Sequence, residues 1–195
     1  TRRSSDLLML ADWICDVACL SETWLTSDTL DSLLCLPAFD MFRRDRQCGR
    51  GGGLLCYVHQ SLYPKRRLDL EPRNMECMVL ELSIACSHPI FLLCCYRPPS
   101  HNARDSFPTL HNTLHSLTTA SPGATLIFLG NLNNHCHIWD VNCSASDTAG
   151  RMLCEMLVDF GLTQVIEEPT RFSSDGTSSA VLTSLRPTCQ ISCQQ

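Results

Sequence analysis

Apolar positions recur at two spacings along the chain and predict alternating strands and helices. Repeats every three or four residues are typical of amphipathic helices and occur at 4–14, 105–118 and 148–162. Short apolar runs bounded by turn residues predict strands at 15–22, 49–59, 76–86, 89–99 and 125–130. Strands that alternate with amphipathic helices favour an α/β or α+β fold, with sheets covered by helices.

Side chains suited to catalysis follow the ends of three predicted strands. Glu22 follows the first, Tyr96 and Arg97 end the strand that Pro98 terminates, and a third exit carries Asn131 and Asn133. Residues distant in sequence can gather at strand ends in a layered sheet protein. We therefore expect one site at this edge.

The length of 195 residues and the 44% hydrophobic content fit one domain over 1–195. The longest apolar stretch, 90–96, is too short to cross a bilayer, and the first residues do not form a signal peptide. We expect an intracellular, soluble protein with no membrane contact. The 14 cysteines lie largely inside apolar runs without a regular spacing, which indicates buried free thiols instead of a disulfide framework.

The net charge of -5 gives no overall attraction to nucleic acid. Between residues 43 and 73, however, eight basic residues face three acidic ones (Asp45, Asp69 and Glu71). The basic residues are Arg43, Arg44, Arg46, Arg50, Lys65, Arg66, Arg67 and Arg73. Two interpretations stay open, a patch that contacts phosphates and a solvated basic loop with no partner.

Five motifs, in this order, resemble one known family. They are LSETWL (20–25), GRGGG (49–53), YRPP (96–99), LGNLNNHCHIWD (129–140) and EPTRF (168–172). Together they resemble the endonuclease domain of LINE-type (non-LTR) retrotransposon polyproteins, within the endonuclease/exonuclease/phosphatase superfamily that includes apurinic/apyrimidinic endonucleases. The resemblance covers roughly residues 12–185.

The resemblance implies a four-layer sandwich of two mixed β-sheets flanked by helices. It implies Mg²⁺-dependent cleavage of DNA phosphodiesters, with Mn²⁺ as a substitute, by a monomeric domain that acts in the nucleus beside a reverse transcriptase domain of the same polyprotein. By motif, Glu22 would bind the metal, Tyr96 would donate a hydrogen bond near the phosphate, and Asn133 would orient the phosphate or the attacking water. The candidate DNA contacts are Arg50, Arg97, His137 and Arg171.

The chain departs from the family pattern at several positions. The family motif Gly-Asp-Phe-Asn reads Gly130-Asn131-Leu132-Asn133 here, and Ser179 occupies a second aspartate position. Asn131 cannot take up a proton near neutral pH, and losing a positioned general base typically costs about 10² to 10⁴ in rate. The N-terminal asparagine and the closing Ser-Asp-His motif of the family are missing, so we expect a domain incomplete at both ends.

Several interpretations remain open. The chain is an impaired endonuclease, a catalytically dead DNA- or partner-binding remnant, or a relic without function. Glu22 could also be a surface residue, and Tyr96 a half-buried strand aromatic. A zinc site at His135, Cys136, His137 and Cys143 has suitable ligand types, but the spacing disfavours it.

Overall fold

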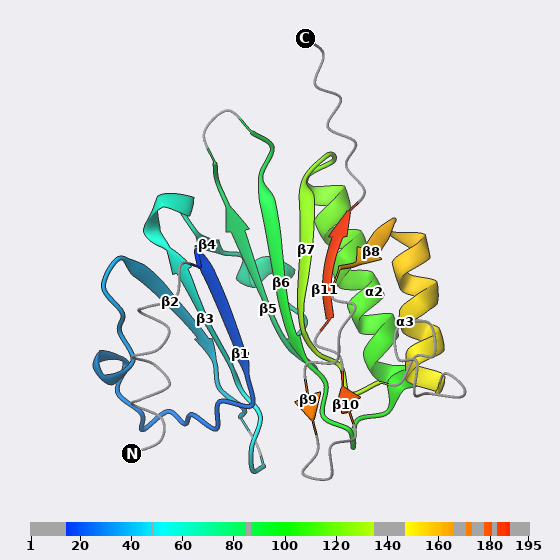
Figure 1. The fold of residues 1–195 in the computed structure, drawn as a ribbon, viewed down its shortest axis with the longest axis horizontal. Helices are drawn as coiled ribbons and strands as arrows, with labels where there is room; N and C mark the ends of the chain where they lie inside the picture. The colour runs from blue at the N-terminus through cyan, green and yellow to red at the C-terminus, as the bar shows by residue number, and fades with distance from the viewer. Residues whose placement is uncertain are drawn as a thin grey trace.

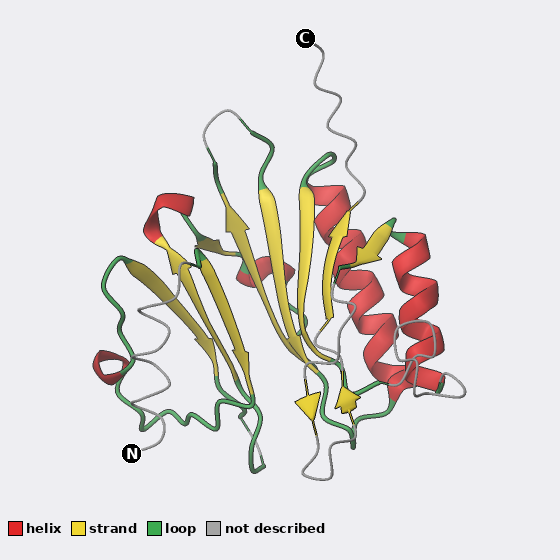
Figure 2. Cartoon of the chain, in the orientation of Figure 1, coloured by secondary structure: helices red, strands yellow, loops and turns green. Residues whose placement is uncertain are grey.

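The structure is a computed structural model that describes residues 15–47, 49–84, 87–134 and 147–165, with the backbone of further short strands at 171–172, 178–180 and 183–187. Two β-sheets face each other, and two helices cover the outer side of the larger one (Figure 1). Figure 2 shows the same separation of strands and helices by colour. The sandwich of sheets flanked by helices that the sequence predicts is therefore confirmed.

The small sheet is antiparallel, with the order β1-β3-β2. Its strands are β1 (Val17–Ser21), β2 (Phe39–Arg44) and β3 (Leu54–His59). In the pairing of β1 with β3, Ser21 lies opposite Leu54. The exit of β1 and the glycine-rich entry to β3 therefore meet at one edge.

The large sheet is mixed, with the order β4-β5-β6-β7-β11-β8. Its strands are β4 (Lys65–Arg66), β5 (Glu76–Leu82), β6 (Ile90–Tyr96), β7 (Thr125–Asn131), β8 (Leu162–Gln164) and β11 (Thr183–Pro187). The strands β5 and β6 form the predicted antiparallel hairpin, whereas β6 and β7 run parallel with Tyr96 opposite Asn131. The parallel pairing places two predicted site residues side by side. A separate two-stranded sheet consists of β9 (Arg171–Phe172) and β10 (Ser178–Ala180).

Two helices pack on the large sheet. Helix α2 (Ala103–Ala120) starts after Asn102, whose side chain accepts a hydrogen bond from the Arg104 amide. Helix α3 (Thr148–Asp159) starts after Asp147, whose side chain accepts from the Gly150 amide. Their apolar faces and one face of the large sheet form a continuous core. Three short 3₁₀ helices lie at Asp31–Leu33, Gln60–Leu62 and Leu68–Leu70.

A second core fills the space between the sheets. It contains alternate residues of β3, β5 and β6, as expected when one face of each strand points inward. Those residues are Leu54, Cys56, Val58, Met78, Leu80, Leu82, Leu92, Cys94 and Tyr96. This packing holds the small sheet against the large one, and both contribute to the candidate site.

Most expected elements are present where the sequence predicts them. Helix α2 extends the predicted 105–118 by two residues at each end, and Gly161, with φ of 59°, follows α3 as a C-terminal glycine. The predicted helix at 4–14 lies outside the described residues. The buried cysteines are free thiols, as expected; they are Cys56, Cys77, Cys94 and Cys95. Among the described residues, no helix is both long and apolar enough to span a membrane.

Candidate active site

The first part of the site is the loop that leaves β1. Both Glu22 and Trp24 have a φ of 56°, a left-handed conformation that is uncommon for residues other than glycine. The amides of Thr23 and Trp24 donate hydrogen bonds to the carbonyls of Gly53 (3.4 Å) and Gly52 (2.9 Å). The glycine-rich segment that enters β3 thus holds this unusual backbone and fixes the position of Glu22.

The close approach of the Thr23 side chain explains why position 53 is a glycine. A Cβ there would lie 2.7 Å from the Thr23 hydroxyl oxygen, and the backbone φ of +89° also disfavours any side chain. The GRGGG motif therefore acts structurally, since it lets two loops lie against each other beside Glu22. It is not a phosphate-binding loop of either standard spacing.

Tyr96 links the two sheets at this edge. The residue is buried at the end of β6, and its hydroxyl donates a short hydrogen bond to the Glu22 carboxylate. Burial, together with this hydrogen bond to Glu22, raises the pKa of Tyr96 to about 12. Tyr96 therefore stays a protonated donor at neutral pH, and it joins a residue of the small sheet to a strand of the large sheet.

The loop after β7 carries the two asparagines. The Asn131 side-chain oxygen accepts a hydrogen bond from the Asn133 amide (2.9 Å), and the Asn133 side-chain nitrogen donates to the Arg97 carbonyl (2.8 Å). The Arg97 amide donates to the Asn131 carbonyl at 2.9 Å. The loops that follow β6 and β7 thus each donate a hydrogen bond to the other. Glu22 is hydrogen-bonded to Tyr96, Tyr96 lies opposite Asn131 in the parallel strand pair, and Asn131 is hydrogen-bonded to the amide of Asn133.

Arg97, predicted to contact a phosphate, has a different environment. It is only 4% exposed, and its guanidinium donates to the carbonyls of Leu132 (2.7 Å), Asn133 (2.6 Å) and His101 (2.6 Å). Burial lowers the pKa of Arg97, with a smaller opposing effect from Asp147. These contacts make Arg97 an internal support of the asparagine loop, because its donors point into the protein instead of toward a ligand.

Most basic side chains of the segment between residues 43 and 73 are paired with acidic side chains in the folded chain. Five of its arginines form ion pairs with acidic side chains, some of which lie outside the segment. The pairs are Arg43 with Asp31 and Asp45, Arg44 and Arg66 with Glu71, Arg46 with Glu76, and Arg67 with Asp69 and Glu81. The patch that the sequence suggests is thereby reduced, among the described residues, to the three exposed cations without an ion pair, Arg50, Lys65 and Arg73. A sequence count of charges cannot detect partners that pair only in the folded chain.

Two residues that the sequence analysis did not assign to the site, Arg46 and Glu76, contact residues of it. Arg46 lies over the Tyr96 ring, with its guanidinium carbon 5.8 Å from the ring centroid, and pairs with Glu76 at 2.5 Å. Glu76 also accepts a hydrogen bond from the Gly53 amide (2.6 Å) and lies opposite Tyr96 in the β5-β6 register. The predicted hairpin of β5 and β6 could have indicated Glu76 as a neighbour of the site, because its register places Glu76 opposite Tyr96. Among the described residues, the Arg46 Nη2 atom has no hydrogen-bond partner.

Of the remaining predicted DNA contacts, Arg50 is the one whose side chain belongs to the described residues. Arg50 is exposed, with its guanidinium 5.4 Å from the centroid of the Trp24 ring. His137 lies outside the described residues, as do the side chains of Arg171 and Ser179, whose backbones belong to β9 and β10. The suggested zinc residues also lie outside the described part. Among the described residues, no three His, Cys, Asp or Glu side chains group as metal ligands.

The family follows from a sequence comparison. A family model described as endonuclease-reverse transcriptase matches residues 90–187, half of the chain. The chain belongs to the endonuclease-reverse transcriptase family. The matched part includes Tyr96, Asn131 and Asn133, and it confirms the resemblance found in the motifs. No match is found among curated protein sequences.

Solved structures support the fold of this endonuclease-reverse transcriptase family member. The endonuclease domain of TRAS1, a telomere-specific non-LTR retrotransposon, matches with a TM-score of 0.71 and 17% identity over 95% of this chain and 79% of that domain. The Xenopus laevis APE2 catalytic domain matches with 0.64 and 13% over 95% and 79%. D. rerio TDP2 complexed with single strand DNA product matches with 0.56 and 15% over 95% and 76%. The chain has the fold that these three proteins share.

Proposed function

We propose that the chain is the endonuclease domain of a non-LTR retrotransposon polyprotein and hydrolyses DNA phosphodiesters with Mg²⁺ or Mn²⁺. The observation that carries the proposal is the contact of the Tyr96 hydroxyl with the Glu22 carboxylate, next to the linked Asn131 and Asn133. The endonuclease-reverse transcriptase family and the non-LTR endonuclease fold support this reaction class. By the same analogy, the domain acts on nuclear DNA as a monomer beside a reverse transcriptase domain.

Glu22 would hold the metal. It is exposed and supplies a carboxylate oxygen, the ligand that a hard divalent cation prefers. Mg²⁺ commonly binds through one or two carboxylates and keeps several waters, so a site in which Glu22 is the one carboxylate not paired with an arginine suits it. The ion would polarise the phosphoryl group and stabilise the leaving oxygen. Glu76 is a poorer ligand candidate, because Arg46 and the Gly53 amide already occupy its oxygens.

Each remaining residue has a positioning role. The Tyr96 hydroxyl fixes the orientation of the Glu22 carboxylate, and the Arg97 carbonyl accepts a hydrogen bond from the Asn133 side chain and holds it in the loop after β7. Neutral Tyr and Asn side chains place no negative charge against a phosphate. Asn131 would position the attacking water by hydrogen bonding without taking its proton. We infer a slow reaction for this reason.

The proposed defect can be repaired with little structural change. Asn131 uses its side-chain oxygen to accept the Asn133 amide, and an aspartate would accept the same hydrogen bond. The Asn131→Asp change therefore preserves the loop while it adds a general base. Because the resemblance also implies an aspartate at position 179, the complete repair combines Asn131→Asp with Ser179→Asp.

The test is conversion of supercoiled plasmid to open circle in Mg²⁺. Nicking by the parent chain that disappears with EDTA and in Glu22→Gln, but persists in Glu155→Gln, supports the proposal. Glu155 is a suitable control because it is an exposed carboxylate on α3. The repaired chain should nick about 10² to 10⁴ times faster than its parent. No nicking by either chain would overturn the proposed reaction.

A second candidate function is DNA binding without cleavage. The observation that favours it is Asn131 itself, which keeps the loop but supplies no base. In this case DNA affinity would persist in Glu22→Gln and fall with rising salt, because ionic contacts to the phosphates would supply it. Fluorescence anisotropy with labelled DNA distinguishes this outcome from a chain that neither binds nor cuts DNA.

A further inference from the structure

Trp24 is a large aromatic residue that remains exposed beside the candidate active site. It is 45% exposed and lies two residues after Glu22. Its backbone is held in the left-handed conformation by a hydrogen bond from its amide to the Gly52 carbonyl. Burial of an aromatic ring is strongly favourable, and strained backbone that the surrounding structure maintains is concentrated at functional sites. The fold therefore holds this exposed ring in a fixed position, where its free surface is available to a ligand.

The glycine-rich segment covers part of the ring. The Arg50 guanidinium carbon lies 5.4 Å from the ring centroid, and a Cβ at Gly51 would stand 3.4 Å from the ring atoms. Arg50 and Gly51 both belong to the glycine-rich segment. This segment covers only part of the ring, and the remaining surface is exposed. A cation against one part of an indole ring strengthens its electrostatic interaction without removing the remaining surface.

A series of contacts connects the Trp24 ring to the candidate site. Arg46 lies over Tyr96 and donates to the Arg50 carbonyl (3.1 Å), and Arg50 lies over Trp24. These contacts form a chain from the Trp24 ring through Arg50 and Arg46 to Tyr96, whose hydroxyl contacts the Glu22 carboxylate. Aromatic rings beside cationic side chains are the combination that binds unpaired bases of a nucleic acid strand, since every base has a π-face.

We propose that Trp24 and Arg50 form a stacking site for one unpaired base of the DNA strand bound at Glu22. The proposal depends on the proposed function for the identity of the ligand. Stacking on Trp24 would select strands whose bases are unpaired near the cleavage point, and Arg50 would support the ring and contact the neighbouring phosphate. This assigns a role in substrate selection to the Trp of the LSETWL motif.

The test measures binding of two labelled single strands of equal length and charge, one with bases and one with an abasic backbone, in EDTA so that no cleavage occurs. The parent chain should bind the base-containing strand about 10-fold more tightly than the abasic strand. Trp24→Ala should remove this difference and leave abasic binding unchanged, while Trp24→Phe should retain most of it. Tyr63→Ala is the matched control, because Tyr63 is a 72% exposed aromatic on a different loop.

Each outcome separates this inference from the proposed function. Equal binding of both strands by the parent chain, or a base preference that survives Trp24→Ala, overturns the stacking site and leaves the plasmid assay unaffected. Absence of nicking with an intact, Trp24-dependent base preference overturns the proposed reaction and supports the stacking site. A cooperative unfolding transition in Trp24→Ala at the parent temperature shows that lost binding reflects the ring and not the fold.

Discussion

Gly130 stands where the end of β7 lies against β6. A Cβ at this position would lie 1.9 Å from the Cys95 carbonyl oxygen, a backbone atom that cannot rotate away. Gly130→Ala should therefore lower the free energy of unfolding by more than about 3 kcal/mol, because the two strands must separate. Gly161→Ala is the control, since its φ of +59° is left-handed but an added Cβ would meet no heavy atom within 4 Å, and it should cost about 1 kcal/mol. Urea denaturation of both variants measures the contrast, and equal losses would contradict this explanation.

The raised pKa of Tyr96 makes the free energy of unfolding depend on pH in the alkaline range. Its pKa is raised to about 12, from an ordinary value near 10. The folded state therefore holds this proton more tightly than the unfolded state does, so the contribution is fully present below about pH 10 and is lost as the pH rises toward 12. In Tyr96→Phe the free energy of unfolding should decline less between these values. Denaturation curves at several alkaline pH values measure the decline, and an unchanged slope would argue against a buried Tyr96 hydroxyl.

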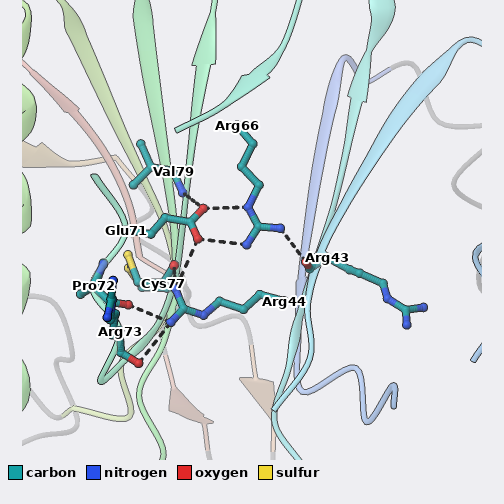
Figure 3. A network of polar contacts seen from close by, with 9 residues as sticks. Arg43, Arg44, Arg66, Glu71, Pro72, Arg73, Cys77 and Val79 are labelled. Atoms are coloured by element: carbon teal, nitrogen blue, oxygen red, sulfur yellow. Dashed lines mark hydrogen bonds and ion pairs between the residues drawn. The ribbon is translucent and has the colours of Figure 1, made fainter. Parts of the chain in front are cut away.

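Glu71 connects elements of both sheets. Its side chain is only 5% exposed and accepts hydrogen bonds from Arg66 on β4, Arg44 on β2 and the Val79 amide on β5. Arg44 also donates to the Cys77 and Pro72 carbonyls, and Arg66 to the Arg43 carbonyl (Figure 3). The network lies between strands of the small and the large sheet. The arginines that looked like a DNA patch in sequence thus fasten the two sheets together.

Loss of Glu71 should loosen this attachment. Glu71→Ala leaves two desolvated guanidinium groups without their carboxylate, and we expect a loss of roughly 3 kcal/mol in the free energy of unfolding. Glu81→Ala is the matched control, because its side chain is 25% exposed in its pair with Arg67 and a surface pair contributes about 0 to 1 kcal/mol. Thermal unfolding measures both. A loss in Glu71→Ala no larger than that in Glu81→Ala would show that the network contributes little.

Sequence periodicity predicted individual elements better than their pairing. The runs at β1, β6 and β7 and the repeats of α2 and α3 are long and regular, so local pattern suffices for them. The strand β2 was missed, because FDMFRR combines half-buried apolar residues with arginines whose partners are distant in sequence. The role of Arg97 was missed for the same reason, since its acceptors are carbonyls of the loop after β7 and of His101. Motifs placed Glu22, Tyr96 and Asn133 as candidates, but not the contacts that link them.

At the scale of the whole molecule, the candidate site depends on the packing of one sheet against the other. The small sheet contributes Glu22, whereas the large sheet contributes Tyr96 and Asn131. The core between the sheets and the Glu71 network maintain their relative position. An isolated half of the chain would therefore lack the site. This dependence also explains why sequence alone could name the residues without proving that they share one edge.

The charge distribution of the whole molecule limits how it can bind DNA. Of the Lys and Arg side chains in the described part of 43–73, three are exposed and have no ion pair: Arg50, Lys65 and Arg73. Few cations of this segment can therefore displace counterions from DNA. Each phosphate contact contributes a slope of about -0.9 to the logarithm of the DNA-binding constant against the logarithm of salt concentration. We expect Arg50→Gln to reduce the magnitude of this slope by about one contact, whereas Arg67→Gln should leave it unchanged because Asp69 and Glu81 already occupy that guanidinium. Anisotropy titrations over a range of salt concentrations measure the slopes. An equal reduction in both variants would mean that the ion pairs of Arg67 with Asp69 and Glu81 open, so that this paired arginine also reaches the DNA phosphates.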